Sequence, residues 1–118
     1  MKTIGIVGSR RRDAIEDYQK CFKVFMSYYE DGDKIVSGGC PKGGDKFAEL
    51  IAKEFDIPIV IHSAQWKVFG RRAGFIRNTK IAEDSDILIA VVAPDRKGGT
   101  EDTVKKVQMR GKKVVLVM

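Results

Sequence analysis

The stretch from Val36 to Asp45 has the composition of an anion-binding loop. Its sequence, VSGGCPKGGD, places four glycines within seven residues. Glycine has no Cβ atom, so the backbone can turn tightly and approach a ligand closely. A helical pattern begins at about Lys46, and the first amide groups of a helix are unpaired and favour anions. The loop therefore predicts a phosphate site rather than a plain flexible turn. The ligand-binding residues expected here are Gly38, Gly39, Gly43, Gly44 and Asp45.

Two further loops begin where a strand-like run ends. Gly8-Ser9-Arg10 follows one apolar run, and Gly98-Gly99-Thr100 follows another. A hydroxyl and a guanidinium can both hold phosphate oxygens, the guanidinium through two parallel bonds. Thr100 is expected to cap a helix, which is compatible with binding a phosphate or a ribose. The ligand-binding residues expected in these loops are Gly8, Ser9, Arg10, Gly99 and Thr100.

The segment from Trp66 to Asn78 adds an aromatic side chain and basic residues. Trp66 is the only tryptophan and is expected in a loop after a strand, where it could stack on a base or cover the edge of the core. Arg77 and Asn78 fall in a predicted helix near the glycine loops. We include Trp66, Arg77 and Asn78 among the expected ligand-binding residues. Asp45 could bond the backbone of its own loop or a ribose hydroxyl.

Common catalytic and nucleotide-binding fingerprints are absent from the sequence. The first strand leads into Gly5-Ile6-Val7-Gly8-Ser9-Arg10 rather than G-x-G-x-x-G, and no G-x-x-x-x-G-K-[ST] loop occurs. His62 is the only histidine, and no nucleophile or carboxylate is paired with it by spacing. No cluster of His, Cys or Asp has metal-ligand spacing. The sequence therefore favours binding over catalysis and predicts neither a metal nor a cofactor.

The order of the expected elements brings the three loops to one edge. Five strand-like runs alternate with four helical patterns, with strands expected at 3–8, 34–37, 57–61, 87–92 and 112–117, and helices at about 13–29, 46–56, 73–83 and 100–110. This order predicts one α/β domain over residues 1–118, a three-layer sandwich around a five-stranded parallel sheet with right-handed crossovers. In such sheets the ligand lies beyond the carboxyl ends of the strands.

Composition sets the broad class and the expected partners. A chain of 118 residues, 43% hydrophobic and 32% charged, suits one soluble domain. No apolar run approaches the roughly 20 residues of a membrane helix, so no membrane association is expected. The first residues enter a strand-like pattern directly, and Cys21 and Cys40 form no disulfide framework. Both observations predict a cytoplasmic protein, and the net charge of +6 favours anionic partners.

The first helix carries a wide apolar stripe. Its members are Ile15, Tyr18, Cys21, Phe22, Phe25, Met26 and Tyr29. Burial in the core accounts for most of a stripe at this spacing. Together with Tyr28, which lies off the stripe, the residues Phe22, Phe25, Met26 and Tyr29 form an aromatic surface that is wide for one helix of a small domain, so self-association into a homo-oligomer is a further expectation.

The chain resembles the SLOG superfamily over nearly its whole length. The residues that carry the resemblance are, in order, Gly8-Ser9-Arg10, Ser37-Gly38-Gly39, Gly43-Gly44-Asp45, Trp66, Ala73-Gly74, Arg77-Asn78, Ala82, Asp86 and Gly99-Thr100. They are most similar to a small branch with the pattern GSR…SGGxxxGxD…W…AGxxRN…GT. The resemblance implies a Rossmann-like fold and a nucleotide-derived ligand. The superfamily includes Lonely Guy phosphoribohydrolases, the DNA-processing protein of natural transformation, and sensors of nucleotide signals in defence systems.

One position departs from the hydrolases of that superfamily. Lonely Guy enzymes carry P-G-G-x-G-T-x-x-E, with a glutamate three residues after the threonine. Thr103 occupies that place here, and Glu101 lies on a different face of the helix, about 100° per residue around the axis. The resemblance therefore implies a phosphate loop without the glutamate that assists N-glycosidic cleavage.

Three functions follow from these residues. The first is binding or sensing of a phosphate-bearing nucleotide or nucleotide-sugar derivative through the three glycine loops. The second is a nucleotide phosphoribohydrolase, an N-glycosidase of the Lonely Guy type. The third is binding of single-stranded DNA, suggested by the positive net charge, although few aromatic residues alternate with the basic ones.

Overall fold

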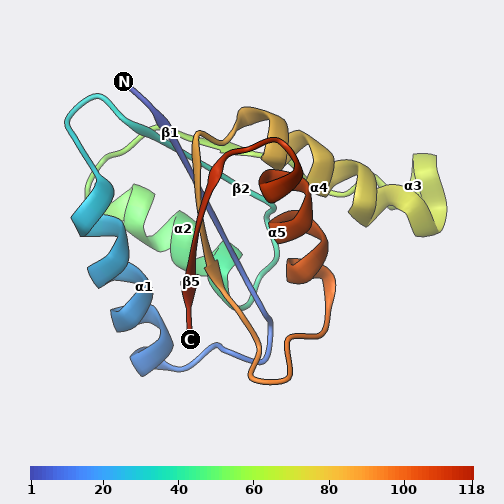
Figure 1. The fold of residues 1–118 in the computed structure, drawn as a ribbon, viewed down its shortest axis with the longest axis horizontal. Coiled ribbons are helices and arrows are strands. Elements are labelled where there is room, and N and C mark those ends of the chain that lie inside the picture. The colour runs from blue at the N-terminus through green and yellow to red at the C-terminus, as the bar shows by residue number, and fades with distance from the viewer.

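The computed structural model describes residues 1–118 and has a single parallel sheet in the order β3-β2-β1-β4-β5 (Figure 1). The strands are β1 (Thr3–Gly8), β2 (Lys34–Ser37), β3 (Ile59–Ile61), β4 (Ile87–Val91) and β5 (Lys113–Val117). The helices are α1 (Ile15–Tyr28), α2 (Gly44–Glu54), α3 (Trp66–Phe69), a 3₁₀ turn at Gly70–Arg72, α4 (Ala73–Asp84) and α5 (Gly99–Met109). The predicted α/β fold with five parallel strands is confirmed.

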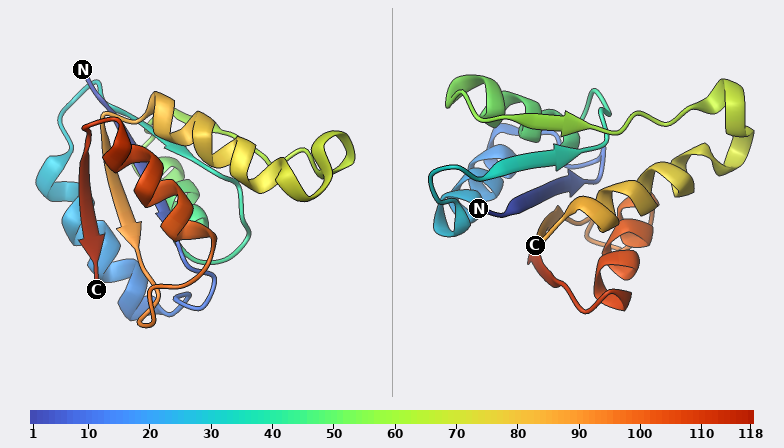
Figure 2. Two further views of the ribbon diagram at one scale, coloured as in Figure 1. Left: turned by 45° about the vertical axis from the view of Figure 1, so that its right-hand side comes forward. Right: turned by 90° about the horizontal axis from the view of Figure 1, so that it is seen from above.

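Helices cover both faces of the sheet. The two views of Figure 2 show α1 and α2 on one side and α4 and α5 on the other. Successive side chains of a strand point to opposite faces. Accordingly, Ile4 and Ile6 of β1 pack in the core under α1 and α2, beside Phe25 and Phe47. Val7 of the same strand packs in the second core, under α4 and α5.

The strand order places the predicted ligand-binding loops at one edge of the sheet. β1 pairs with β2 on one side and with β4 on the other, and Gly8 lies opposite Val91 at the end of the β1–β4 pair. The chain therefore changes direction across the sheet between β1 and β4, where α/β proteins bind ligands. The loops after β1, β2 and β4 all leave this edge, as predicted.

Several element boundaries differ from the sequence prediction. β3 begins at Ile59 rather than Ile57, because the backbone of Ile57 bonds back to Ala52 after α2 ends. Trp66 lies in the short helix α3, which projects from the body of the molecule, rather than in a loop (Figures 1 and 2). On α1, Ile15 and Met26 are 63% and 47% exposed, so the buried part of the predicted stripe is narrower than expected.

Asp13 and Thr100 have the residue types of helix N-caps, but neither is the cap in the structure. The N-cap of α1 is Ala14, because the neighbouring carboxylate of Asp13 instead accepts a hydrogen bond from the Gly43 amide, at 2.9 Å, and pairs with Lys46. These donors hold the pKa of Asp13 below its usual range. The N-cap of α5 is Gly98, so Thr100 lies within the first turn. No helix in the structure combines the length and the apolar character needed to cross a membrane.

Candidate functional site

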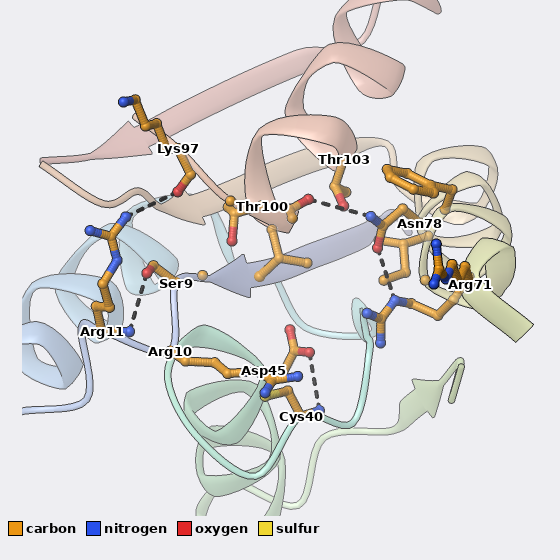
Figure 3. A pocket seen from close by; sticks show the side chains of 18 of the residues that line it. Ser9, Arg10, Arg11, Cys40, Asp45, Arg71, Asn78, Lys97, Thr100 and Thr103 are labelled. Atoms are coloured by element: carbon orange, nitrogen blue, oxygen red, sulfur yellow. Dashed lines mark hydrogen bonds between the residues drawn. The ribbon is translucent and has the colours of Figure 1, made fainter. Parts of the chain in front are cut away.

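A cavity of about 610 Å³ opens at the carboxyl edge of the sheet, between the loops that follow β1 and β4 (Figure 3). This volume lies within the range of small-molecule sites. The cavity is lined by the end of β1 and its loop, by Cys40 and Asp45, by residues of α3 and α4, and by the segment from Asp95 to Thr103. Elements from both halves of the sheet therefore contribute to one site.

Most of the residues expected from the sequence meet in this cavity. The lining includes Gly8, Ser9, Arg10, Asp45, Trp66, Arg77, Asn78, Gly99 and Thr100. The residues it does not include are Gly38, Gly39, Gly43 and Gly44. The four glycines of the loop after β2 thus lie behind the site, although Cys40 and Asp45 of the same segment line it.

Gly43 and Gly44 let α2 begin directly against β1. A Cβ atom on Gly44 would lie 2.2 Å from the carbonyl carbon of Val7, and one on Gly43 would lie 2.3 Å from the backbone oxygen of Ser9. Gly43 also has a φ of +76°, which side chains disfavour. These glycines are needed for close contact between backbones, and the partner is the β1 loop rather than a ligand.

Arg77 joins the β2 loop to the cavity. Its Nη1 donates to the carbonyl oxygen of Gly38 at 2.7 Å, and its Nε donates to Oδ1 of Asn78 at 2.8 Å. A Cβ atom on Gly38 would meet both the Arg77 guanidinium and the Asp45 carboxylate, each at 2.7 Å. Gly38 is therefore the residue that allows these two charged groups to approach the loop.

Asp45 is a buried carboxyl group on the wall of the cavity. Its Oδ2 accepts from the Cys40 amide at 3.1 Å, and its Oδ1 lies 3.1 Å from the Ser37 hydroxyl. That hydroxyl also contacts the Ile6 carbonyl at 2.6 Å, and its one proton can serve only one acceptor at a time. Burial raises the pKa of Asp45, although the Cys40 amide and Arg77 partly offset this effect. A protonated Asp45 could itself donate to Ser37.

The Asp45→Asn variant is expected to gain stability relative to the wild type as the pH rises. Because the folded-state pKa of Asp45 is raised, its contribution to stability is present below the unfolded-state pKa and is lost as the pH rises through the folded-state value. Asparagine can keep both hydrogen bonds and carries no charge. Urea unfolding of both proteins at pH 4 and pH 7 measures this difference. If the wild type instead became more stable relative to the variant from pH 4 to pH 7, a raised pKa of Asp45 would be contradicted.

Three consecutive arginines after β1 have three different environments. Arg12 is 8% exposed and donates to the backbone oxygens of Val92, Val117 and Met118. Arg11 lines the cavity but forms a two-bond pair with Asp95, which holds the pKa of that carboxyl below its usual range. Arg10 also lines the cavity and forms no hydrogen bond or ion pair within the protein. Arg10 and Arg11 therefore line the cavity, whereas Arg12 has a structural role.

The positive charges around the cavity exceed the negative ones. Arg11 is paired with Asp95, and Arg77 lies beside Asp45. The remaining cationic residues of the lining are without an ion-pair partner in the protein, namely Arg10, Arg71 and Lys97. Lys97 immediately precedes the Gly98 cap of α5, where the helix presents unpaired amide groups. The end of the cavity formed by Arg10 and the start of α5 therefore suits an anion, whereas Arg71 lies at the other end, between α3 and α4 (Figure 3).

Aromatic side chains border the other side of the cavity. Trp66 and Phe75 are each 57% exposed and both belong to the lining. A Cβ atom on Gly74 would lie 3.5 Å from the Trp66 ring, so the indole lies next to the start of α4. Trp66 thus contacts α4 and the cavity and does not cover the core. Stacking of a base on Trp66 stays a prediction.

The structure adds residues to the cavity that sequence reasoning did not select. They include Arg11, Cys40, Arg71, Phe75, Lys97 and Thr103. The sequence shows two basic pairs in predicted loops, Arg71-Arg72 and Arg96-Lys97, but only Arg71 and Lys97 line the cavity. Arg96 instead donates a hydrogen bond to Glu101 at 2.8 Å. Spacing in a loop does not reveal which of two neighbours faces inward.

The fold and the cavity define a Rossmann-like α/β protein with a site of small-molecule size. No family model matches the chain, and no curated protein matches it in sequence. Among solved structures, the chain is similar to the molybdenum cofactor binding protein from the phototrophic bacterium Rippkaea orientalis, with a TM-score of 0.75 and 20% sequence identity. The match covers 98% of this chain and 75% of that protein. At this identity the likeness shows the fold.

Proposed function

We propose that this chain binds or senses a phosphate-bearing nucleotide or nucleotide-sugar derivative in the cavity, as a member of the SLOG superfamily. The observation that carries the proposal is the set of unpaired cations, Arg10, Arg71 and Lys97, around a cavity beside the start of α5. Phosphate is bound well by arginine, by lysine and by the amide groups of a helix N-terminus.

The positions of the polar and aromatic residues predict how the ligand is oriented in the cavity. Arg10 and Ser9 of the β1 loop and the backbone of Lys97 in the β4 loop lie at the end where the phosphate would bind, and the exposed Lys97 side chain is drawn directed away from Ser9 (Figure 3). Trp66 and Phe75 stand at the other side, where a flat base would stack. A nucleotide carries both groups in one molecule, whereas inorganic phosphate would use only one end.

The molybdenum cofactor of the structural neighbour is a related candidate, because it combines a flat pterin ring with a phosphate. The cationic residues of the cavity suit the phosphate, and Trp66 and Phe75 suit the ring. No group of three or more His, Cys, Asp or Glu side chains is arranged to hold a metal ion. The chain's own residues would therefore hold such a cofactor through the phosphate and the ring.

The carboxylates around the cavity support binding rather than N-glycosidic hydrolysis. Glu101 does not line the cavity and is held by Arg96, while Asp95 is paired with Arg11. Thr103 occupies the place of the hydrolase glutamate. Asp45 is the remaining carboxyl of the lining, and burial favours its neutral form. Release of free base from nucleoside monophosphates at high protein concentration would instead establish the hydrolase.

Calorimetry with a panel of ligands tests the proposal. The panel consists of the common ribonucleoside 5′-monophosphates, ADP, ADP-ribose, NAD and molybdopterin. Binding of at least one member by the folded protein is the expected result. Absence of binding across the panel would count against the proposed function, and retention of a short single-stranded DNA alone would favour the nucleic-acid alternative.

The Arg10→Ala and Lys97→Ala variants are expected to weaken binding of that panel member by about tenfold each, because each charge-assisted contact to phosphate contributes about 1.5–3 kcal/mol. Lys20→Ala is the matched control, since Lys20 is an exposed cation on α1 away from the cavity. Calorimetric Kd values measured at one salt concentration provide the comparison. Equal losses in all three variants would show that net charge, and not this site, governs binding.

A further inference from the structure

Thr103 presents a hydroxyl group to the cavity from a buried position. The residue is 1% exposed and lines the cavity. No hydrogen bond within the protein engages its hydroxyl, yet no side-chain nitrogen or oxygen that is sealed from solvent lacks a partner. The small exposed part of Thr103 is therefore its hydroxyl oxygen, at the wall of the cavity (Figure 3).

The neighbouring contacts explain why this hydroxyl is free. A threonine inside a helix usually donates to the carbonyl oxygen four residues earlier, and Thr79 of α4 does so, to Phe75 at 3.0 Å. The equivalent acceptor for Thr103 is the carbonyl oxygen of Gly99, which accepts instead from Nδ2 of Asn78 at 3.3 Å. The buried Asn78 amide thus occupies the acceptor that Thr103 would otherwise use.

The position of Thr103 on α5 relates it to the proposed phosphate site. Gly99 and Thr100 precede it by four and three residues, so the three residues share one face of the helix, with Cβ atoms about 5–6 Å apart where they exist. Beside Thr103, the lining residues Val7 and Ile81 are apolar. The Asn78 amide also lies on this wall, but it is engaged by Arg77, Gly99 and Asp102, so the Thr103 hydroxyl is the polar group there that has no partner in the protein.

We propose that the Thr103 hydroxyl forms a hydrogen bond with a hydroxyl of the ligand's sugar, next to the phosphate, and so selects sugar phosphates over inorganic phosphate. A sugar hydroxyl lies a few bonds from the phosphate and can both donate and accept, as threonine can. The inference rests on the proposed function, because it takes the phosphate position from it. Thr103 is a specificity-determining residue in this role.

Titrations with ribose 5-phosphate, AMP and inorganic phosphate test the inference. Thr103→Val keeps the shape of the side chain and removes the hydroxyl, while Thr103→Ser keeps the hydroxyl. The valine variant is expected to bind ribose 5-phosphate and AMP about five- to tenfold more weakly than the wild type, from the loss of one hydrogen bond. The serine variant is expected to stay within about twofold, and the affinity for inorganic phosphate is expected to be unchanged in both.

The outcomes separate this inference from the function on which it rests. Wild-type protein that binds neither sugar phosphate overturns the inference, and absence of binding across the whole calorimetric panel overturns the proposed function with it. Binding of AMP by the wild type and, with equal affinity, by Thr103→Val overturns the inference alone. An equal loss for inorganic phosphate also overturns it, because it reports a general disturbance of the site. Thr103→Ala gives the same comparison if valine prevents folding, as checked by thermal unfolding.

Discussion

The Gly44→Ala variant is expected to lose roughly 3 kcal/mol of unfolding free energy, because the added methyl group has no space. Its Cβ atom would lie 2.2–2.4 Å from the carbonyl carbon and oxygen of Val7 and from the amide nitrogen of Gly8. These are backbone atoms of the central strand, so no side-chain rotation can relieve the overlap. The N-terminus of α2 would have to move away from β1, and with it the wall of the cavity formed by Asp45.

Gly99→Ala is the matched control for this substitution. Gly99 also begins a helix at the edge of the sheet, but a Cβ atom there meets nothing within 4 Å. Alanine favours helix over glycine by up to about 1 kcal/mol, so the control is expected to be as stable as the wild type or slightly more stable. Urea unfolding measures both variants. Equal stability of the two would mean that Gly44 is not in close contact with β1.

The Arg12→Leu variant is expected to lose about 3 kcal/mol of unfolding free energy, because it removes a buried charge with several partners. The guanidinium donates to the carbonyl oxygens of Val92 and Val117 at 3.0 and 2.7 Å, and to Asp17 at 2.9 Å. Leucine would leave the Val92 carbonyl oxygen without this donor and Asp17 without its ion pair, and the Val117 carbonyl oxygen would keep only its bond from the Val92 amide. The ends of β4 and β5 would also lose their link to the segment before α1.

Arg11→Leu provides the comparison at the next position in the chain. Arg11 also pairs with an aspartate through two hydrogen bonds, but both side chains are about half exposed. Exposed ion pairs contribute little to stability, so this variant is expected to unfold almost as the wild type does. Thermal and urea unfolding of the two variants measure the contrast. A loss in Arg11→Leu as large as that in Arg12→Leu would contradict the structural role given to burial.

The positions of the loops could be predicted because they depend on the order of the elements. Alternating strands and helices require a parallel sheet, and parallel strands bring their carboxyl ends to one edge. Gly8-Ser9-Arg10 and Gly99-Thr100 therefore reached the cavity as expected. The strand β4 could be predicted from its continuous apolar run, and every residue from Ile87 to Val91 is buried in the structure.

The roles of single residues within the loops depended on contacts that the sequence does not contain. Gly43 and Gly44 have the composition of a phosphate loop, but the group that approaches them closely is the β1 backbone. Arg10 and Arg12 are identical in type and two residues apart, yet one faces the cavity and the other is bonded to the ends of β4 and β5. Thr103 was first a departure from a hydrolase pattern, and only the bond from Asn78 to Gly99 shows why its hydroxyl is free.

Titration of the protein with a nucleotide and with the matching nucleoside tests phosphate recognition most directly. The pair differs only in the phosphate group, so base stacking on Trp66 is the same for both. The unpaired cations Arg10 and Lys97 predict that the nucleotide binds at least about tenfold more tightly, and that this advantage shrinks as salt is added. Equal affinity for the two ligands, or binding of neither by the folded protein, would contradict a phosphate site in this cavity.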